Sequence, residues 1–178
     1  MHGVRTGPAK LKGIDVDMHH ISDTVMTLAA LAPLADGPTT IRNVANIRIK
    51  ETDRLIAIVN ELRRLGQGVD HGEDWITITP APVRPSPVAL KRQQAIYTRT
   101  GLTAGVNLNC SLAPQVQPAE IECYADHRMA MSFAVLGCAV PGVTITDPAC
   151  TAKTYPKFFA DLEEMRAKVG TSSDPESQ

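Results

Sequence analysis

Apolar residues follow two different patterns in the helical stretches of this 178-residue chain. Residues 25–34 and 129–140 are apolar runs without a polar face, which predicts two helices buried inside a core. Residues 54–65 instead place apolar side chains on one stripe, with Glu61 among the polar residues opposite, and residues 156–169 are also amphipathic. The chain should therefore contain two core helices and two helices with a solvent face.

Alternation of apolar and polar residues predicts short strands between these helices. Gly66 follows the first amphipathic helix directly, as a C-terminal cap residue does. Residues 72–74 form a polar, glycine-containing turn between two alternating runs, which predicts a β-hairpin. The predicted strands are residues 11–18, 39–44, 69–71, 75–79, 120–124 and 143–146.

Residues 23–66 and 126–170 present the same features in the same order. Each begins with Asp-x-x-Met, continues as an apolar helix, a glycine and a Thr-Ile strand, and then presents a lysine before an amphipathic helix. Duplication explains this ordered set. It predicts helices inside and sheets outside, with equivalent loops facing one point, and the residues expected there are Asp23, Lys50, Asp126, Arg128 and Lys153.

Residues 46–54 gather charge immediately before the first amphipathic helix. Residues 46–49 alternate as in a half-buried strand or a tight loop, and Asp53 stands where a helix N-cap stands. Lys50, Glu51 and Arg54 would then surround a helix N-terminus, which favours anions. A solvated charge cluster and a binding site for a small anion are the two interpretations that this pattern leaves open.

The expected convergent loops combine cations with groups that transfer protons. Arginine binds carboxylate or phosphate through paired hydrogen bonds, and lysine binds them as a point charge. Carboxylates and histidine serve in acid–base steps. No nucleotide-binding glycine loop and no nucleophile elbow occur in the sequence. The candidates are the cations Lys50, Arg54, Arg128 and Lys153, and the proton-transfer groups Asp23, Glu51 and His127.

Composition excludes several partners and cofactors. A net charge of −1 gives no electrostatic basis for binding nucleic acid or a membrane surface. The four cysteines contain no CxxC pair, and no His/Cys spacing suits zinc, so we expect no metal. Reduced thiols and the absence of an apolar leader predict a cytoplasmic protein.

Residues 84–118 differ from the rest of the chain. They are rich in proline, and no acidic residue occurs between Asp74 and Glu120. A loop of this length within a domain is uncommon, so we expect a flexible insertion, with a basic docking patch as the alternative. The predicted organisation is an irregular segment at 1–10, one domain over 11–170 and a disordered tail at 171–178.

Four sequence segments together resemble the 5-enolpyruvylshikimate-3-phosphate synthase family of the shikimate pathway. They are LKGIDVDMHHISDTVMTLA (11–29), KETDR (50–54), DHRMAM (126–131) and TAKTYP (151–156). The resemblance covers about residues 11–79 and 119–168 and corresponds to the C-terminal part of the family's chain. It implies an α/β fold of the inside-out type, with buried helices, outer sheets and repeated β-α units.

The resemblance also implies an activity. The family transfers the enolpyruvyl group of phosphoenolpyruvate to the 5-hydroxyl of shikimate 3-phosphate, without a metal or organic cofactor. By the family's motifs, Asp23 contacts the attacking hydroxyl, and Glu51 and Lys153 transfer protons. The implied substrate contacts are Asn46 and Lys50 for shikimate phosphate and Arg54 and Arg128 for the phosphoenolpyruvate carboxylate, with His127 beside them.

The resemblance leaves the family's N-terminal domain unaccounted for, so a missing N-terminal domain is an expected partner and the chain alone should have little or no turnover. A split-enzyme half or non-catalytic remnant, and a UDP-N-acetylglucosamine enolpyruvyl transferase, are the alternatives. A plastid is the alternative compartment. Asp126 is expected to cap a helix or fasten a loop, and Arg48 is as consistent with a structural role as with a functional one.

Overall fold

A computed structural model of the chain describes residues 11–82 and 116–171. The irregular segment predicted at 1–10, the predicted insertion apart from residues 116–118, and residues 172–178 of the predicted tail lie outside this description. Thr171 belongs to the last helix. The elements, with η for 3₁₀ helices, are β1 (Asp15–Asp17), η1 (His19–Thr24), α1 (Val25–Leu31), η2 (Ala32–Leu34), β2 (Thr39–Arg42), η3 (Ala45–Ile49), α2 (Arg54–Arg64), β3 (Gly68–His71), β4 (Ile76–Thr79), β5 (Ala119–Ile121), α4 (His127–Ala139), β6 (Val143–Ile145), η4 (Pro148–Lys153) and α5 (Phe158–Thr171).

The duplication that the sequence predicts is present in the fold. The elements β1-α1-β2-η3-α2 and β5-α4-β6-η4-α5 follow the same order. In each unit the two strands are parallel, with Asp15 opposite Thr40 in one and Ala119 opposite Val143 in the other. The strand–helix–strand step is therefore nearly the same length in both units.

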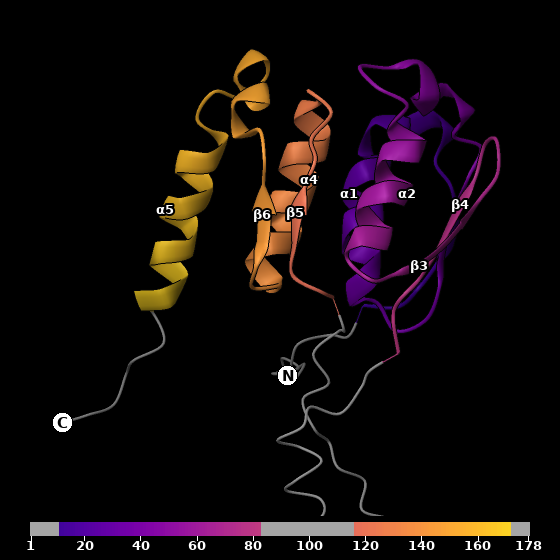
Figure 1. The fold of residues 1–178 in the computed structure, drawn as a ribbon, viewed down its shortest axis with the longest axis horizontal. Coiled ribbons are helices and arrows are strands. Elements are labelled where there is room, and N and C mark those ends of the chain that lie inside the picture. Colours follow the sequence, from indigo (N-terminus) through magenta and orange to yellow (C-terminus); the bar gives the residue numbers. More distant parts are fainter. Residues whose placement is uncertain (1–10, 83–115, 172–178) are drawn as a thin grey trace, which may run out of the picture.

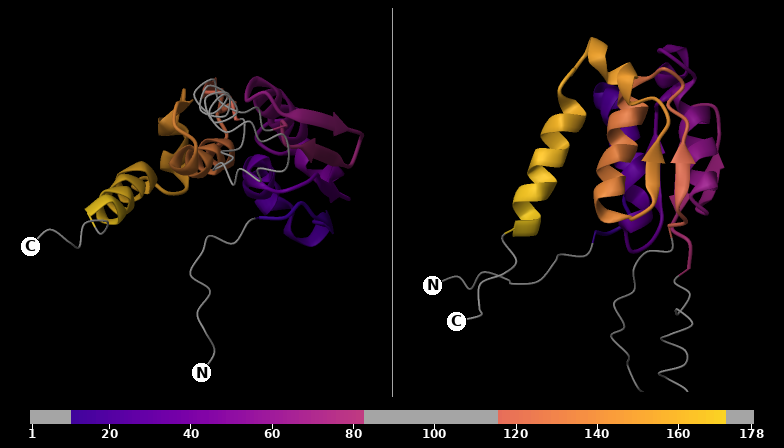
Figure 2. Two further views of the ribbon diagram at one scale, coloured as in Figure 1. Left: turned by 90° about the horizontal axis from the view of Figure 1, so that it is seen from below. Right: turned by 60° about the vertical axis from the view of Figure 1, so that its left-hand side comes forward.

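Helices α1, α2 and α4 lie together between the β5–β6 pair and the four-stranded sheet, and α5 lies outside them (Figure 1). One sheet has the strand order β1-β2-β4-β3, and the other pairs β5 with β6. Helices α1 and α4 pack on each other, α2 packs on β3, and β6 packs along α4. The two further views show the same arrangement, with α5 at the edge away from the four-stranded sheet (Figure 2). The inside-out α/β architecture is thus confirmed.

The core forms where α1, α2 and α4 meet. Helix α1 buries Val25, Met26 and two alanines, and α4 buries Met129 and Phe133. The two central helices are less enclosed than their sequences predict, since Thr27 is exposed and Val135 is 37% exposed. Over residues 11–82 and 116–171, every helix is too short or too polar to cross a bilayer.

Most of the predicted elements are confirmed, and the differences concern their ends. Pro33 ends α1 as expected, and the chain continues as the 3₁₀ turn η2. The β3–β4 hairpin forms with antiparallel pairing, and Gly66 follows α2 with a φ of 80°. Residues 45–49 form a 3₁₀ helix, so the tight-loop alternative is closer than the strand. Helix α5 starts at Phe158, two residues later than predicted.

Glu61 corrects the prediction for the polar face of α2. Its side chain is fully buried, although the helical pattern places it toward solvent. Its Oε1 accepts a hydrogen bond from the Tyr124 hydroxyl at 2.9 Å, and its Oε2 accepts one from the Glu122 amide at 3.1 Å. The segment after β5 covers this face of α2, and a helical period cannot show that another segment will pack there.

We expect Glu61→Ala to lower the free energy of unfolding by about 2–3 kcal/mol, because it leaves the Tyr124 hydroxyl and the Glu122 amide without their acceptor. Urea unfolding of the variant measures this change. Glu163→Ala is the matched control on α5, where the glutamate side chain is 72% exposed and should contribute little. Equal stabilities of the two variants would contradict a structural role for Glu61.

Candidate active site

The first part of the site is built at the N-terminus of α2. The Asp53 carboxylate accepts a hydrogen bond from the Ile56 amide at 3.1 Å, which confirms the predicted N-cap. Its second oxygen accepts from Arg48 Nη1 at 2.7 Å. Arg48 also donates to the carbonyls of Gly72 and Glu73 in the β3–β4 turn. Arg48 therefore holds the loop before α2 against the hairpin.

The second part is built at the N-terminus of α4. Tyr124 and Ala125 have positive φ values of 54° and 51°, so the chain turns sharply before Asp126. The buried Asp126 carboxylate then caps α4 by accepting from the Arg128 amide at 2.8 Å. Its other oxygen accepts from Arg54 Nε at 2.7 Å, which joins the start of α4 to the start of α2. Asp126 thus acts as both a cap and a fastener between the two units.

Arg54 is the centre of the cluster, and it is only 1% exposed. Besides Asp126, its guanidinium donates to Glu51 Oε2 at 2.7 Å and to Asp23 Oδ1 at 3.2 Å. All three carboxylates therefore take their positions from one buried arginine. The resemblance assigns Arg54 to a substrate carboxylate, and here each of its nitrogens already faces a carboxylate of the protein.

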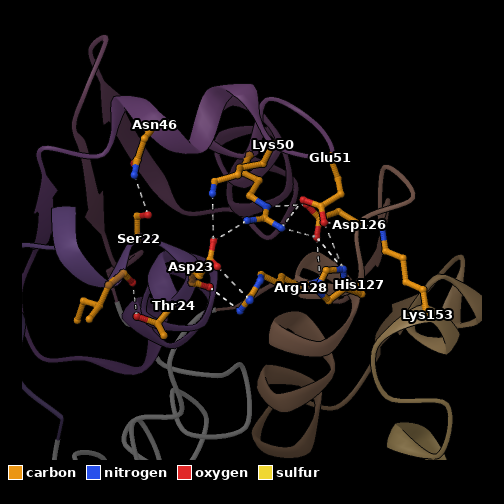
Figure 3. Close-up of polar contacts among 12 residues, drawn as sticks. Ser22, Asp23, Thr24, Asn46, Lys50, Glu51, Asp126, His127, Arg128 and Lys153 are labelled. Atoms are coloured by element: carbon orange, nitrogen blue, oxygen red, sulfur yellow. Dashed lines mark hydrogen bonds and ion pairs between the residues drawn. The ribbon is translucent and has the colours of Figure 1, made fainter.

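Asp23 lies on the exposed side of this cluster. Arg128 donates to its carboxylate at 3.2 Å and to its backbone carbonyl at 3.0 Å. Lys50 Nζ lies 3.8 Å from Asp23 Oδ1. Figure 3 shows these three side chains pointing toward one another from η1, α4 and the loop after η3. The side chains of Lys50 and Arg128 are 38% and 36% exposed, so an anion from solvent can reach them.

Glu51 connects the remaining groups. Its Oε1 lies 3.8 Å from Lys153 Nζ and 3.8 Å from His127 Nδ1. Lys153 reaches it from the end of η4, the element equivalent to η3 in the other unit. The sequence-predicted cluster is therefore assembled. Its four cations outnumber its three carboxylates, which favours an anionic ligand; the cations are Lys50, Arg54, Arg128 and Lys153, and the carboxylates are those of Asp23, Glu51 and Asp126.

Asn46 lies apart from the charged groups. Its side-chain nitrogen donates to Ser22 Oγ at 2.9 Å, and Ser22 precedes Asp23. Its buried side-chain oxygen has no hydrogen-bond partner among the residues that the structure describes. Asn46 therefore offers an unsatisfied acceptor on the η1 side of the cluster, near Ser22.

Burial and neighbouring charges compete in setting the pKa values of Asp126 and His127. The interactions with neighbours prevail for Asp126, and burial prevails for His127. Burial would raise the pKa of Asp126, but hydrogen bonds from Arg54 and the Arg128 amide outweigh it and hold the pKa below its ordinary value. Burial lowers the pKa of His127 from its ordinary 6.5, against the attraction of Asp126 and Glu51. Asp126 is therefore ionised and His127 neutral at pH 7.

A small cavity opens beside Asp23 and Arg128, with a volume of about 120 Å³. Thr27 of α1 and Ser132 of α4 both line this cavity, and their hydroxyls lie 3.2 Å apart. Helical periodicity assigns both residues to a buried core, so their place in a cavity wall depends on the packing of α1 on α4. Four of its lining residues are not among the candidates that the sequence predicts, namely Thr27, Met131, Ser132 and Thr154.

Within residues 11–82 and 116–171, no cluster of three or more histidine, cysteine or acidic side chains is arranged to hold a metal ion. The carboxylates of the site are instead paired with arginine and lysine. The arrangement can bind a small molecule with more than one negative charge and can place carboxylate and ammonium groups beside it for proton transfer.

We expect acid to destabilise the fold through His127. Its folded-state pKa lies below the unfolded value of 6.5, so its contribution to stability is present above that value and is lost as the pH falls toward the folded pKa. Urea unfolding between pH 7 and pH 5 measures this loss. His127→Gln should flatten the dependence in that window, whereas exposed His20→Gln should leave it unchanged.

Buried helices beside outer sheets, with basic and acidic groups gathered at the helix ends, define an α/β protein with a charged cluster that can accommodate a small polyanion beside acid–base groups. Comparison with known proteins names the family. Residues 1–162 match the family model of EPSP synthase (3-phosphoshikimate 1-carboxyvinyltransferase), and the chain belongs to this family.

Individual relatives support this assignment. The chain is 48% identical over 160 residues to a 3-phosphoshikimate 1-carboxyvinyltransferase of Nostoc punctiforme, covering 90% of the chain and 30% of that relative. It is 42% identical to a chloroplastic relative from Brassica napus, covering 26% of its length. A solved EPSP synthase structure from Acinetobacter baumannii superposes with a TM-score of 0.65 at 26% identity, covering 87% of the chain and 30% of that structure. The chain thus spans less than a third of these relatives.

Proposed function

We propose that this chain supplies one half of an EPSP synthase active site, namely the C-terminal share that holds phosphoenolpyruvate and shikimate 3-phosphate during carboxyvinyl transfer. The observation that carries the proposal is the single cluster formed by Asp23, Glu51, Lys153 and their arginine partners at the meeting point of two duplicated units. Family membership supplies the reaction class, and the net positive cluster supports anionic substrates.

The exposed cations are the proposed contacts for the substrates. Lys50 and Arg128 both pair with Asp23. A phosphate or carboxylate of the substrate could replace Asp23 as the partner of one of these cations. Asn46 adds an amide on the same side for shikimate 3-phosphate. Buried Arg54 can reach a substrate carboxylate only by giving up a contact with Glu51 or Asp23, so substrate binding would exchange one carboxylate for another.

Proton transfer is proposed for three groups. Asp23 would accept the proton of the attacking hydroxyl as the new C–O bond forms. Glu51 would transfer a proton at the phosphoenolpyruvate methylene. Lys153, 3.8 Å from Glu51, would transfer a proton at the departing phosphate. His127 is neutral, so it would orient Glu51 without adding charge. No cofactor takes part in the proposed reaction.

The two units differ in the sheets that the structure describes. In the first unit, the β3–β4 hairpin extends the sheet and packs on α2. In the second, the described residues hold only β5 and β6, and Met165 on α5 is 57% exposed. The chain spans 30% of the Nostoc punctiforme relative, and this supports the proposal that a missing N-terminal domain completes the site. A split-enzyme half or a non-catalytic remnant remains the alternative.

The experiment that tests the proposal is a chimaera. The 160 aligned residues of the Nostoc punctiforme relative are replaced by this chain, and turnover of phosphoenolpyruvate with shikimate 3-phosphate is measured. The proposal expects carboxyvinyl transfer at a rate within about tenfold of the parent enzyme. A larger loss of rate would indicate that at least one catalytic group is out of position. A folded but inactive chimaera would favour the non-catalytic remnant.

We expect the chain alone to show little or no turnover, because it spans 30% of the Nostoc punctiforme relative and lacks the proposed domain that would close the site and exclude water. A steady-state phosphate-release assay on the purified chain measures this. Thermal shifts with shikimate 3-phosphate and with UDP-N-acetylglucosamine identify the acceptor, since only a bound ligand raises the apparent stability. Protection by the nucleotide sugar alone would favour the alternative enolpyruvyl transferase.

For the compartment we propose the cytoplasm, with a plastid as the alternative suggested by the chloroplastic relative. The thiols of Cys123, Cys138 and Cys150 are free, which supports a reducing compartment.

A further inference from the structure

Arg48 is a cation of the charged segment before α2 to which the proposed reaction gives no task. Each of its guanidinium nitrogens donates to a protein acceptor: Nη1 to the Asp53 carboxylate at 2.7 Å, Nε to the Glu73 carbonyl at 2.7 Å and Nη2 to the Gly72 carbonyl at 3.0 Å. Its side chain is 26% exposed, less than that of Lys50 at 38%. These contacts indicate a role toward other parts of the protein, not toward a ligand from solvent.

The bond between Arg48 and Asp53 closes the base of a short surface loop. Ile47 is fully buried, whereas Ile49 is 86% exposed, so the chain leaves the core at Arg48. Residues 49–52 then run outside the core until Asp53 caps α2. Because the large apolar side chain of this loop, Ile49, is exposed, hydrophobic packing does not fix the loop, and its position depends on polar contacts.

The β3–β4 turn gives this loop a fixed point of attachment. The Gly72 amide donates to the Trp75 carbonyl at 3.0 Å and closes the turn, and the Asp74 carbonyl accepts from the Val44 amide at 2.9 Å. The Trp75 indole packs directly on Gly72, where a Cβ atom would lie 2.2 Å from the indole nitrogen. Strand β4 also pairs with β2. Arg48 therefore ties the loop to the four-stranded sheet.

The equivalent lysine of the second unit is held by local contacts instead. Lys153 ends η4, where the hydroxyl of the buried Thr151 donates to the Pro148 carbonyl at 2.9 Å. The Thr151 carbonyl accepts from the Tyr155 amide at 2.8 Å. These bonds join neighbouring residues, whereas Arg48 reaches a turn that is 25 residues away. In the first unit a long-range contact of one arginine thus performs the task of a local turn.

We propose that Arg48 is a positioning residue, which holds Lys50 and Glu51 in place by tying their loop to the β3–β4 turn. The inference rests on the proposed function, in which Lys50 contacts shikimate 3-phosphate and Glu51 transfers a proton. Glu51 Oε1 lies 3.8 Å from both Lys153 Nζ and His127 Nδ1, so a small shift of the loop takes it away from its neighbours. A displacement of about 1 Å can cost about 10²-fold in rate.

The kinetic test is Arg48→Met in the active chimaera, because methionine keeps an unbranched side chain and removes all three hydrogen bonds. We expect kcat to fall about 10–10²-fold, since Glu51 is displaced. The KM for shikimate 3-phosphate should rise about tenfold, since Lys50 moves with the same loop. The KM for phosphoenolpyruvate should stay nearly unchanged, because its proposed contacts, Arg54 and Arg128, lie outside the loop.

Arg42→Met is the matched control. Arg42 also uses its guanidinium to bind an aspartate, Asp15, but both side chains are 58% exposed and lie outside the candidate site. This variant should keep kcat and both KM values. An Arg48→Met variant that does the same would refute the positioning role.

Two further variants distinguish positioning from simple stabilisation of the fold. Arg48→Lys should recover only part of the activity, because one nitrogen cannot occupy the three positions of the guanidinium fork. In a Glu51→Gln background, Arg48→Met should lower kcat far less than in the parent, because Arg48 acts through Glu51. Full recovery by lysine, or an equal loss of kcat in both backgrounds at unchanged KM values, would contradict the proposal.

A measurement on the chain alone separates this inference from the proposed function. An inactive unsubstituted chimaera would refute the proposed function, whereas the position of the loop is measured without turnover by NMR relaxation of the backbone amides. In Arg48→Met the order parameters of residues 49–52 should fall from about 0.85 to below about 0.6, and in Arg42→Met they should not change. A loop that stays equally rigid in Arg48→Met would show that Arg48 does not hold it.

Discussion

Asp126→Ala is expected to lower the free energy of unfolding by about 3–5 kcal/mol, because it leaves the buried Arg54 without the one of its three carboxylate partners that is fully buried. The carboxylate of Asp126 is fully buried and receives Arg54 Nε at 2.7 Å. The substitution also removes the cap of α4, which by itself is worth about 0.5–2 kcal/mol. Urea unfolding at pH 7 measures the loss.

The matched control is Asp15→Ala. Asp15 also receives two hydrogen bonds from one arginine, Arg42, at 2.6 Å each, but both side chains are 58% exposed. Its removal should change stability little, because water screens and replaces the pair. Asp126→Asn separates the two contributions, since the amide can still cap α4 but carries no charge to balance Arg54. Similar losses for the two alanine variants would show that burial does not determine the strength of the pair.

Glu51→Gln is expected to lower kcat by about 10²–10⁴-fold in the active chimaera, because glutamine keeps the shape of the side chain and cannot transfer a proton. Its oxygen can still accept from Arg54, so the folded cluster should remain intact. Steady-state kinetics with both substrates separate kcat from KM, and a loss in kcat at a nearly unchanged KM is the expected result.

Glu73→Gln serves as the control for this substitution. Glu73 lies exposed in the β3–β4 turn, and the contact that the described residues show for it is made by its backbone carbonyl, with Arg48. It should keep the activity of the unsubstituted chimaera. If Glu51→Gln changes KM and leaves kcat intact, Glu51 binds substrate and the proton-transfer assignment must move to another group.

The sequence predicted the architecture well because duplication is a repeated pattern that needs no knowledge of contacts. Two apolar helices, two amphipathic ones and the strands between them follow from local periodicity. The order of the units then indicated that Lys50 and Lys153 occupy equivalent places, and the structure joins both to one network through Asp23 and Glu51.

Sequence reasoning was less successful where burial depends on a distant segment. Arg54 and Glu61 are charged positions of an amphipathic helix, and both are fully buried because α4 and the segment after β5 cover them. The cavity lining at Thr27 and Ser132 has the same origin, since their contact spans the interface of α1 and α4. Such residues have no local signal that separates them from solvent-facing or core positions.

The sequence alone determined the repeated unit, the two buried helices and the identity of the charged groups at their ends, because periodicity and capping act over a few residues. Only the tertiary structure decided which charge stands at the centre. Arg54 collects Asp23, Glu51 and Asp126 from three separate segments, leaving Lys50, Arg128 and Lys153 to face solvent. A buried charge must gather its partners from wherever the fold brings them, and that choice depends on packing across the whole chain.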